Sequence, residues 1–389
     1  MASTPTNTVP QHTHKFPCSQ CGAELDFDPA QNALTCKYCG NVVPIPTTKV
    51  AIKEHQLQEG LLAERAEGWG TETRSFKCKS CMATIAVEPS VVSTECPFCG
   101  SNQVFALEES SKVIKPESLI PFKIDQDTAL SKFRQWLGSG WFRPNAVKQI
   151  ARGAQTHQLH GVYLPFWTFD ALTSSWWEAE AGYYYYETER YTVVEDGKRV
   201  TKTRQVRKIR WEPASGSHQQ VFDDVLVYAT KSVDQRILQK IYPFDTKALV
   251  PYQPQYLSGW AAEEYQIPLK EGWTLAQQIM NEQIRAACAQ KIPGDTYRNL
   301  SVDTAYANVT YKHVLFPVWI ASYRYRNKLY HFMVNGQTGE VQGQAPISWI
   351  KVLIAIVIAL LIIACIVAGL SALSSLGGGG TSALLLPLI

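Results

Sequence analysis

Residues 18–39 read CSQCGAELDFDPAQNALTCKYC, and residues 78–99 repeat the same frame as CKSCMATIAVEPSVVSTECPFC. In both segments fourteen residues separate two Cys-x2-Cys pairs. Each pair turns the chain so that two thiolates point at one centre, and two pairs complete a tetrahedral shell. The spacing therefore predicts two zinc ribbons, each holding one structural Zn2+, at Cys18, Cys21, Cys36, Cys39 and at Cys78, Cys81, Cys96, Cys99.

A disulfide framework is the alternative use of these eight cysteines, and it requires an oxidising compartment. No apolar secretion signal is visible in the first residues, so we expect reduced thiolates. A catalytic zinc ion keeps one coordination position for water, whereas four thiolates close the shell. Both zinc sites are therefore expected to be structural.

The second decisive stretch is Val352–Leu370, nineteen residues without a charge. As a helix it spans about 28 Å, close to the hydrocarbon thickness of a bilayer. Lys351 stands directly before it, and no charged residue follows. The sequence predicts one transmembrane helix with the large N-terminal region in the cytoplasm, because positive charge stays on that side.

Between these stretches the chain shows a weak internal repeat. IPFK at 120–123 recurs as IPLK at 267–270, and VYLPFW at 162–167 recurs as VLFPVW at 314–319. Chance similarity is the alternative. A helix is expected after each tetrapeptide, the first with cap Asp127 and an apolar stripe, the second with a capping box and a second stripe. These stripes are Leu130, Phe133, Leu137 and Leu275, Ile279, Met280, and the capping box is Thr274 with Gln277.

Aromatic strands with turn signals at Asp196-Gly197, Asn335-Gly336 and Thr338-Gly339 follow these helices. The sequence predicts an α+β fold in which each of two units lays a helix on an antiparallel sheet. Between the ribbons, Leu57, Leu61 and Leu62 lie along one side of a short helix. The expected parts are a disordered tail 1–15, ribbon 16–46, helical linker 47–75, ribbon 76–105, α+β units 106–260 and 261–348, transmembrane helix 349–373 and an apolar Gly-rich tail 374–389.

Charge separates two uses of a zinc ribbon. Within residues 16–46 one cation, Lys37, faces Glu24, Asp26 and Asp28, and the second ribbon is balanced. Nucleic-acid binding depends on clustered Lys and Arg, which neither ribbon supplies. We therefore expect the ribbons to dock protein.

Seven cations in thirteen residues form a basic arm, which we expect on a long hairpin. Such an arm can reach anionic lipid or nucleic acid, or serve as a solvated strand face that prevents aggregation. The nearby aromatic residues Trp176, Trp177 and Tyr183–Tyr186 suit core and cross-strand packing, a bilayer interface or stacking on bases. The seven cations are Lys198, Arg199, Lys202, Arg204, Arg207, Lys208 and Arg210.

Motifs of catalysis are absent from the sequence. There is no ATP-binding G-x-x-x-x-G-K-[ST] loop, no H-E-x-x-H and no G-x-S-x-G. Cys288 and Cys365 lie in predicted helices, where a thiol packs as a small apolar group. We therefore expect no enzyme.

Several segments together carry a family resemblance: LPFW at 164–167, FDDVLV at 222–227, LVPY at 249–252 and VNGQTGEV at 334–341. With two ribbons and a terminal membrane helix, the chain resembles bacterial TFIIB-type zinc-ribbon membrane proteins. These are often labelled primosomal protein N′, a replication restart helicase, although the ATP-binding loop is missing here. The resemblance extends to partners of phage-shock protein A and of SPFH-domain, flotillin-like scaffolds in membrane stress.

The resemblance implies an adaptor anchored in the inner membrane that recruits such a scaffold. The residues are consistent with a tail-anchored cytoplasmic protein with docking ribbons, and oligomers are possible on this reading. The other hypothesis is a membrane-tethered nucleic-acid-binding protein of replication or transcription that uses the basic arm.

Overall fold

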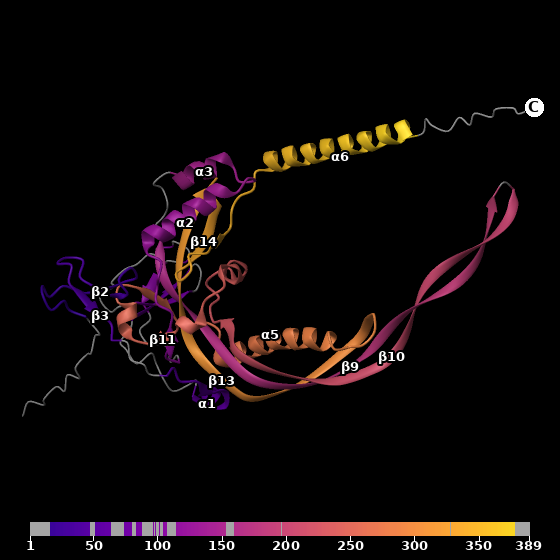
Figure 1. The fold of residues 1–389 in the computed structure, drawn as a ribbon. Helices are drawn as coiled ribbons and strands as arrows, with labels where there is room; N and C mark the ends of the chain where they lie inside the picture. Colours follow the sequence, from indigo (N-terminus) through magenta and orange to yellow (C-terminus); the bar gives the residue numbers. More distant parts are fainter. Residues whose placement is uncertain are drawn as a thin grey trace, which may run out of the picture.

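The computed structural model describes residues 16–46, 51–63, 74–79, 83–87, 96, 98, 101, 104–106, 114–152, 159–195, 197–326 and 328–377. They form a mixed α+β fold with a cysteine cluster near the N-terminus and one apolar C-terminal helix (Figure 1). The predicted tail 1–15, Cys81 and Cys99 of the second ribbon, and the end of the apolar tail lie outside the described residues.

Three very long antiparallel strands form the framework: β9 (His160–Glu195), β10 (Lys198–Tyr228) and β13 (Thr296–Tyr325). β10 pairs with β9 along nearly its whole length, and β13 pairs with β9 from His160 to Gly182. The alternating aromatic and β-branched residues of these segments suit a half-buried pleated surface. The aromatic strands and the hairpin turn at Gly197 are as the sequence predicts.

Shorter strands extend this sheet at its edges. β8 (Ser118–Leu119) runs parallel to β13, and β12 (Ala261–Glu263) runs parallel to β9. β14 (Lys328–Asn335) pairs with β13 and joins β15 (Val341–Gly343) through the predicted turn at residues 336–340. The other pieces of the body are α4 (Gln235–Leu238), β11 (Val250–Pro251) and 3-10 turns at Gln239–Ile241, Thr246–Ala248 and Pro254–Leu257.

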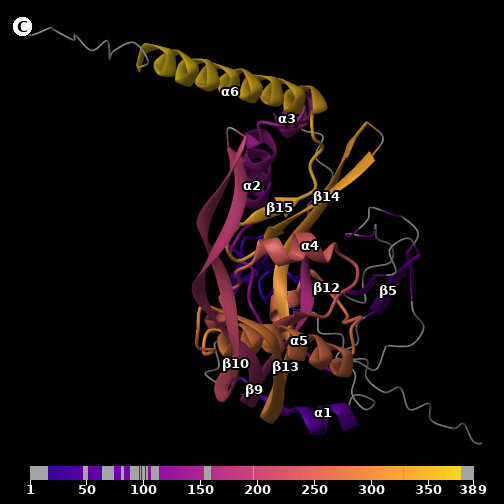
Figure 2. The ribbon, with the colours of Figure 1, turned by 90° about the vertical axis from the view of Figure 1, so that its right-hand side faces the viewer.

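The two six-residue repeats lie beside each other in this sheet. Val162 pairs with Val318 and Trp167 with His313, so the segments run antiparallel as direct neighbours. The strands expected in two units thus belong to one continuous sheet (Figure 2). The internal repeat itself stays a prediction.

Beyond Gly182 the hairpin of β9 and β10 continues as a two-stranded arm. Thirteen residue pairs, from Tyr183–Arg210 to Glu195–Lys198, have no third strand beside them among the described residues. At about 3.3 Å per residue the arm reaches about 43 Å past the sheet. Figure 1 shows it as a twisted ribbon that leaves the body on the same side as the C-terminal helix.

Bulges curve the long strands. The register shifts between Phe222 and Val225, between Arg298 and Ser301, and between Ala307 and Thr310. Asp224, Asn299 and Asn308 lie at these shifts with φ of 51°, 55° and 51°. Short polar side chains tolerate this left-handed conformation, and each extra residue bends its strand.

Helix α5 (Leu269–Ala289) covers the sheet where the three long strands meet. The predicted capping box is wrong, because the helix begins earlier and the Thr274 hydroxyl donates to the carbonyl of Lys270. The predicted stripe is also displaced, since Ile279 is exposed and Leu275 half-buried. The helix turns a face with small residues toward the sheet, because the Trp167 ring lies too close for a larger side chain: a Cβ added at Gly272 would meet this ring at 2.7 Å. The buried face is Leu269, Gly272, Ala276, Met280, Ile284 and Cys288.

Helix α2 (Gln126–Ser139) packs on the other end of the body and is followed by α3 (Asn145–Arg152). Asp125 caps α2 by accepting a hydrogen bond of 2.7 Å from the backbone N–H of Thr128, so the predicted cap at Asp127 is wrong by two residues. The hydrogen bonds from Thr128 hold the pKa of Asp125 below its ordinary value. Of the predicted stripe, Phe133 and Leu137 are buried and Leu130 is half-buried.

The linker is part of the body. β4 (His55–Gln56) pairs with β13, and α1 (Leu57–Ala63) follows directly. Leu57 is buried, whereas Leu61 and Leu62 are exposed, so only one of the three leucines of the predicted stripe packs against the body. The segment predicted as the first ribbon contains β1 (Asp26–Asp28), β2 (Ala33–Thr35) and β3 (Val42–Pro44). The segment predicted as the second contains β5 (Arg74–Cys78), β6 (Thr84–Val87) and β7 (Val104–Ala106).

The last element is α6 (Trp349–Gly377). The most apolar window within its stretch Trp349–Gly369 has a mean hydropathy of 3.3, and none of that window is buried within the described part of the molecule. It is long and apolar enough to cross a membrane, as the sequence predicts.

Candidate functional site

Four cysteines of the first ribbon converge. The Sγ atoms of Cys18, Cys21, Cys36 and Cys39 all lie within 4.8 Å of one another, and Cys18–Cys39 and Cys21–Cys36 are each 3.5 Å apart. Zn–S bonds of about 2.3 Å in a tetrahedron place sulfur atoms about 3.8 Å apart. The cluster therefore fits one four-coordinate metal ion.

The backbone explains why each Cys-x2-Cys pair turns in this way. The N–H of Cys18 donates to the carbonyl of Ala23, five residues on, and the N–H of Cys36 donates to that of Asn41. Gly22 and Gly40 follow the second cysteine of each pair with φ of 76° and 74°, where a side chain would be strained. These turns leave the thiols on the inner side of two facing loops.

The second cysteine frame repeats the same backbone hydrogen bond at both of its described cysteines. The N–H of Cys78 donates to the carbonyl of Ala83 and that of Cys96 to Ser101, again five residues on and both at 2.9 Å. Cys78 and Cys96 are buried with Phe98 and Ile85. Their partners Cys81 and Cys99 lie outside the described residues, so the second zinc site stays a prediction.

The protonation of the first cluster favours a cation. Burial alone would raise the pKa of Cys18, but hydrogen bonds from the backbone of Gln20 and Cys21, among others, outweigh it and lower the pKa to about 6. Cys39 behaves in the opposite way: a backbone hydrogen bond from Asn41 lowers its pKa, yet burial and the neighbouring thiols raise it to about 12. Four thiolates at these distances would therefore repel one another, and a divalent ion would relieve that repulsion.

The first ribbon is fixed to the body rather than free. The Ser258 hydroxyl donates to the carbonyl of Leu25 at 2.6 Å, and Trp260 Nε1 donates to that of Phe27 at 3.0 Å. The Phe27 ring packs edge-on against Tyr256, with centroids 5.2 Å apart. One side of the ribbon is thus covered by residues 256–260.

The opposite side of the ribbon faces solvent. Tyr38, between the second pair of cysteines, is 85% exposed, and Cys21 and Cys39 are exposed beside it. Lys37 forms an ion pair of 2.6 Å with Asp26. Tyr38, Cys21 and Cys39 together form the exposed tip of the ribbon beside the cysteine cluster.

The seven predicted cations do lie together on β10 of the arm. The arm, residues 183–210, carries eight cations against four acidic residues, whereas the whole chain has a net charge of only +3. The pairing of β9 with β10 places the cations on two different faces of the arm, because residues opposite each other in an antiparallel pair share one face. Sequence reasoning missed Arg190, which lies on β9 opposite Thr203 of β10.

On one face the charges are compensated within the arm. Arg204 pairs with Glu189 at 3.1 Å, Lys208 pairs with Glu187, and Lys202 lies on the same side. The ion pair with Glu187 raises the pKa of Lys208. This face is therefore closer to neutral.

The other face of the arm contains no Asp or Glu at its register positions, and we call it the acid-free face. It carries Arg190, Arg199 and Arg207, all exposed. The Arg207 guanidinium stacks over the Tyr184 ring at 4.4 Å, and Tyr186 is 66% exposed. Of the predicted aromatic run, Trp177 is buried in the core, while Trp176 and Tyr184–Tyr186 are exposed.

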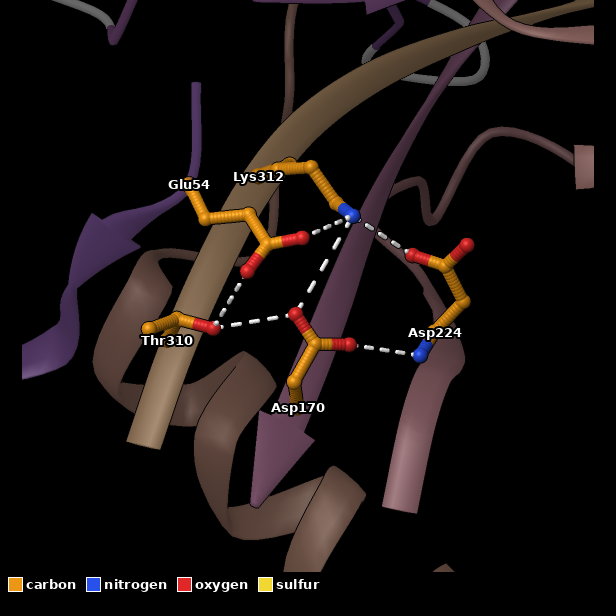
Figure 3. A network of polar contacts seen from close by, with 5 residues as sticks. All are labelled: Glu54, Asp170, Asp224, Thr310 and Lys312. Atoms are coloured by element: carbon orange, nitrogen blue, oxygen red, sulfur yellow. Dashed lines mark hydrogen bonds and ion pairs between the residues drawn. The ribbon is translucent and has the colours of Figure 1, made fainter. Parts of the chain in front are cut away.

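A buried ion cluster is the polar centre that sequence reasoning missed (Figure 3). The Lys312 side chain, 8% exposed, lies 2.8 Å from Asp224 and 3.0 Å from Glu54, with Asp170 at 4.0 Å. Thr310 donates to Asp170 at 2.9 Å. The bulge at Asp224 lets its backbone N–H donate to Asp170.

This ion cluster joins distant parts of the chain. Burial alone would lower the pKa of Lys312, but its bonds to Asp224 and Glu54 raise it. Burial raises the pKa of Asp170. Asp170, Asp223 and Asp224 are close enough to hold a metal ion, but the Lys312 ammonium already lies beside two of them, Asp170 and Asp224. We interpret the cluster as a set of ion pairs that hold the linker residue Glu54 against the sheet.

Comparison with known proteins gives one similarity over nearly the full length. The chain is similar to the uncharacterized protein YdjG of Bacillus subtilis (strain 168). The two are 27% identical over 348 residues, which cover 87% of this chain and 91% of YdjG. No family model matches the chain, and no solved structure matches it. The resemblance to zinc-ribbon membrane proteins therefore stays a prediction.

Proposed function

We propose that this protein is a membrane-anchored adaptor whose cysteine ribbons hold two structural zinc ions and dock a protein partner. The observation that carries the proposal is α6, because none of its most apolar window is buried among the residues that the structure describes. An exposed apolar helix of this length needs a lipid environment. The large body then lies on the cytoplasmic side of the inner membrane.

Zinc is the metal that best suits four thiolates at this spacing, since soft sulfur ligands in a tetrahedron select it. The hydrogen bond from the cysteine N–H to the carbonyl five residues on recurs at Cys78 and Cys96, which supports a second site of the same kind. Each closed site would stabilise its ribbon instead of activating water. The absence of catalytic motifs supports an adaptor over an enzyme.

The exposed tip of the first ribbon supports docking. Tyr38 is a rigid aromatic residue on a metal-braced turn, and tyrosine is frequent among the residues that dominate interfaces. The predicted partner is an SPFH-type or phage-shock protein A-type scaffold at the membrane. The arm favours the nucleic-acid alternative only through its charge.

The test uses the full chain, captured from detergent-solubilised membranes. We expect a membrane scaffold to co-elute with the wild-type chain and to be lost with Tyr38→Ala, while both chains keep equal metal. Leu62→Ala is the matched control, because Leu62 is 84% exposed away from the cluster. Equal capture of the scaffold by the wild-type chain and by Tyr38→Ala would refute the proposal that the ribbon docks the partner. Recovery of nucleic acid in place of protein would favour the alternative.

A further inference from the structure

The base of α6 touches a corner of the body from far back in the sequence. The backbone N–H of Ser348 donates to the carbonyl of Phe142 at 2.7 Å. Lys351 Nζ donates to the carbonyl of Arg143 at 2.8 Å and to Asn145 Oδ1 at 2.7 Å. The corner between α2 and α3 is therefore fixed against the point where the chain would enter the membrane (Figures 1 and 2).

Large apolar side chains are exposed at this junction. Trp141 and Phe142 on the corner are 60% and 44% exposed, and Trp349 in the first turn of α6 is 78% exposed. Ile347 and Ile350 are 59% and 73% exposed. We call these five residues the collar.

Positive charge predominates along the chain segment that forms this corner. From Thr128 in the first turn of α2 to Arg152 at the end of α3, the sequence has five cations and no acidic residue, whereas Asp125 and Asp127 lie at the start of α2. The cations are Lys132, Arg134, Arg143, Lys148 and Arg152. Arg143 stacks on the Trp136 ring with 4.0 Å to its centroid, which places a guanidinium directly beside the collar.

We propose that the α2–α3 corner is a second membrane contact, in which the collar enters the headgroup region of an anionic bilayer. Tryptophan prefers the boundary between water and lipid, where its ring is shielded and its N–H stays hydrated. Basic residues beside it attract anionic headgroups. The hydrogen bonds to Ser348 and Lys351 then fix the orientation of the body relative to the membrane. The inference rests on the proposed anchor role of α6.

The lipid surface is favoured over a protein partner by continuity. The collar adjoins the span itself, and two of its five residues belong to α6. Any bilayer that receives α6 therefore meets the corner as well. A protein would have to compete with lipid for the same position.

Photo-crosslinking in the full chain tests the proposal. Benzoylphenylalanine is placed singly at Trp141, at Phe142, at Leu360 within the span and at Tyr38 on the ribbon. Each purified chain is reconstituted into vesicles of phosphatidylethanolamine and phosphatidylglycerol and irradiated. The fraction of protein carrying a lipid adduct is measured by mass. We expect adducts at Trp141 and Phe142 at least tenfold above those at Tyr38 and comparable with those at Leu360.

The outcomes separate the two claims. Adducts at Leu360 without adducts at Trp141 and Phe142 would overturn the collar and leave the anchor intact. A protein–protein adduct at Trp141 would also overturn it. No lipid adduct at Leu360 would refute the anchor and the collar together. Using two corner positions guards against one label that disturbs folding.

Discussion

Replacing Lys312 with Met should destabilise the body strongly. The substitution keeps the length and apolar stem of the side chain but removes the ammonium that lies among Glu54, Asp170 and Asp224. Three carboxylates then share a poorly hydrated site without a cation. Packing is nearly unchanged, so the effect reports electrostatics.

The size of the effect follows from burial. Removing one partner of a buried ion pair costs about 3–5 kcal/mol. Glu54 and Asp224 keep contact with water, with side chains 44% and 22% exposed, which places the expected loss near the lower end. We expect about 3 kcal/mol. The matched control is Lys231→Met, whose pair with Glu271 is half-exposed, and its expected loss is about 0–1 kcal/mol.

Urea unfolding of the full chain in detergent measures the difference. With a slope of about 3 kcal/mol per M, the midpoint should fall by about 1 M for Lys312→Met and barely move for Lys231→Met. The loss should shrink as pH falls from 7 to 5. Burial already holds the pKa of Asp170 above its ordinary value, and the charge of Lys312 lowers it. Without that charge the pKa of Asp170 rises further, so the folded variant takes up a proton at a higher pH than the folded wild type.

Two results would refute this reasoning. Equal midpoints for both variants would mean that Lys312 contributes no more than a surface lysine. A loss that grows as pH falls from 7 to 5 would contradict the direction of the Asp170 shift.

Three further predictions concern the ribbon and the arm. Cys36→Ser should remove one metal ion per chain from the first ribbon, measured by elemental analysis; an unchanged metal content would contradict the assignment of this cluster. Ser258→Ala should speed amide hydrogen exchange at Leu25 and Phe27 by about tenfold or more, with metal content unchanged, because the buried carbonyl of Leu25 loses its donor. Exchange as slow as in the wild-type chain would show that this bond does not fix the ribbon. Changing Arg190, Arg199 and Arg207 to Gln should weaken binding to heparin by about 1 kcal/mol per residue, so the variant should elute from a heparin column at a lower salt concentration. The same change of charge at Lys202, Arg204 and Lys208 should lower it less, because Glu187 and Glu189 already compensate that face; equal effects would refute the division into two faces.

Local patterns predicted the ends of the chain well. The Cys-x2-Cys spacing fixes which thiols of the first ribbon can meet, and the uncharged run of α6 needs no partner to be recognised. Both signals lie within a few tens of residues. The hairpin turns at Gly197 and at residues 336–340 are local in the same sense.

Features that depend on long-range contact could not be read in this way. The ion cluster joins residues 54, 170, 224 and 312, and nothing local marks Lys312 as buried. The buried face of α5 includes Gly272 and Ala276, which a search for large apolar residues passes over. The acid-free face of the arm exists only once the register is known, because Arg190 comes from the opposite strand.

Membrane fractionation tests the central claim most directly. The full chain and a chain ending at Ser348, which lacks α6, are expressed in bacteria, and the membranes are washed with alkaline carbonate. The account predicts that the full chain stays in the washed membrane, while the shortened chain is recovered in the supernatant with its metal bound. Release of the full chain by carbonate would contradict a spanning α6 and the adaptor built on it.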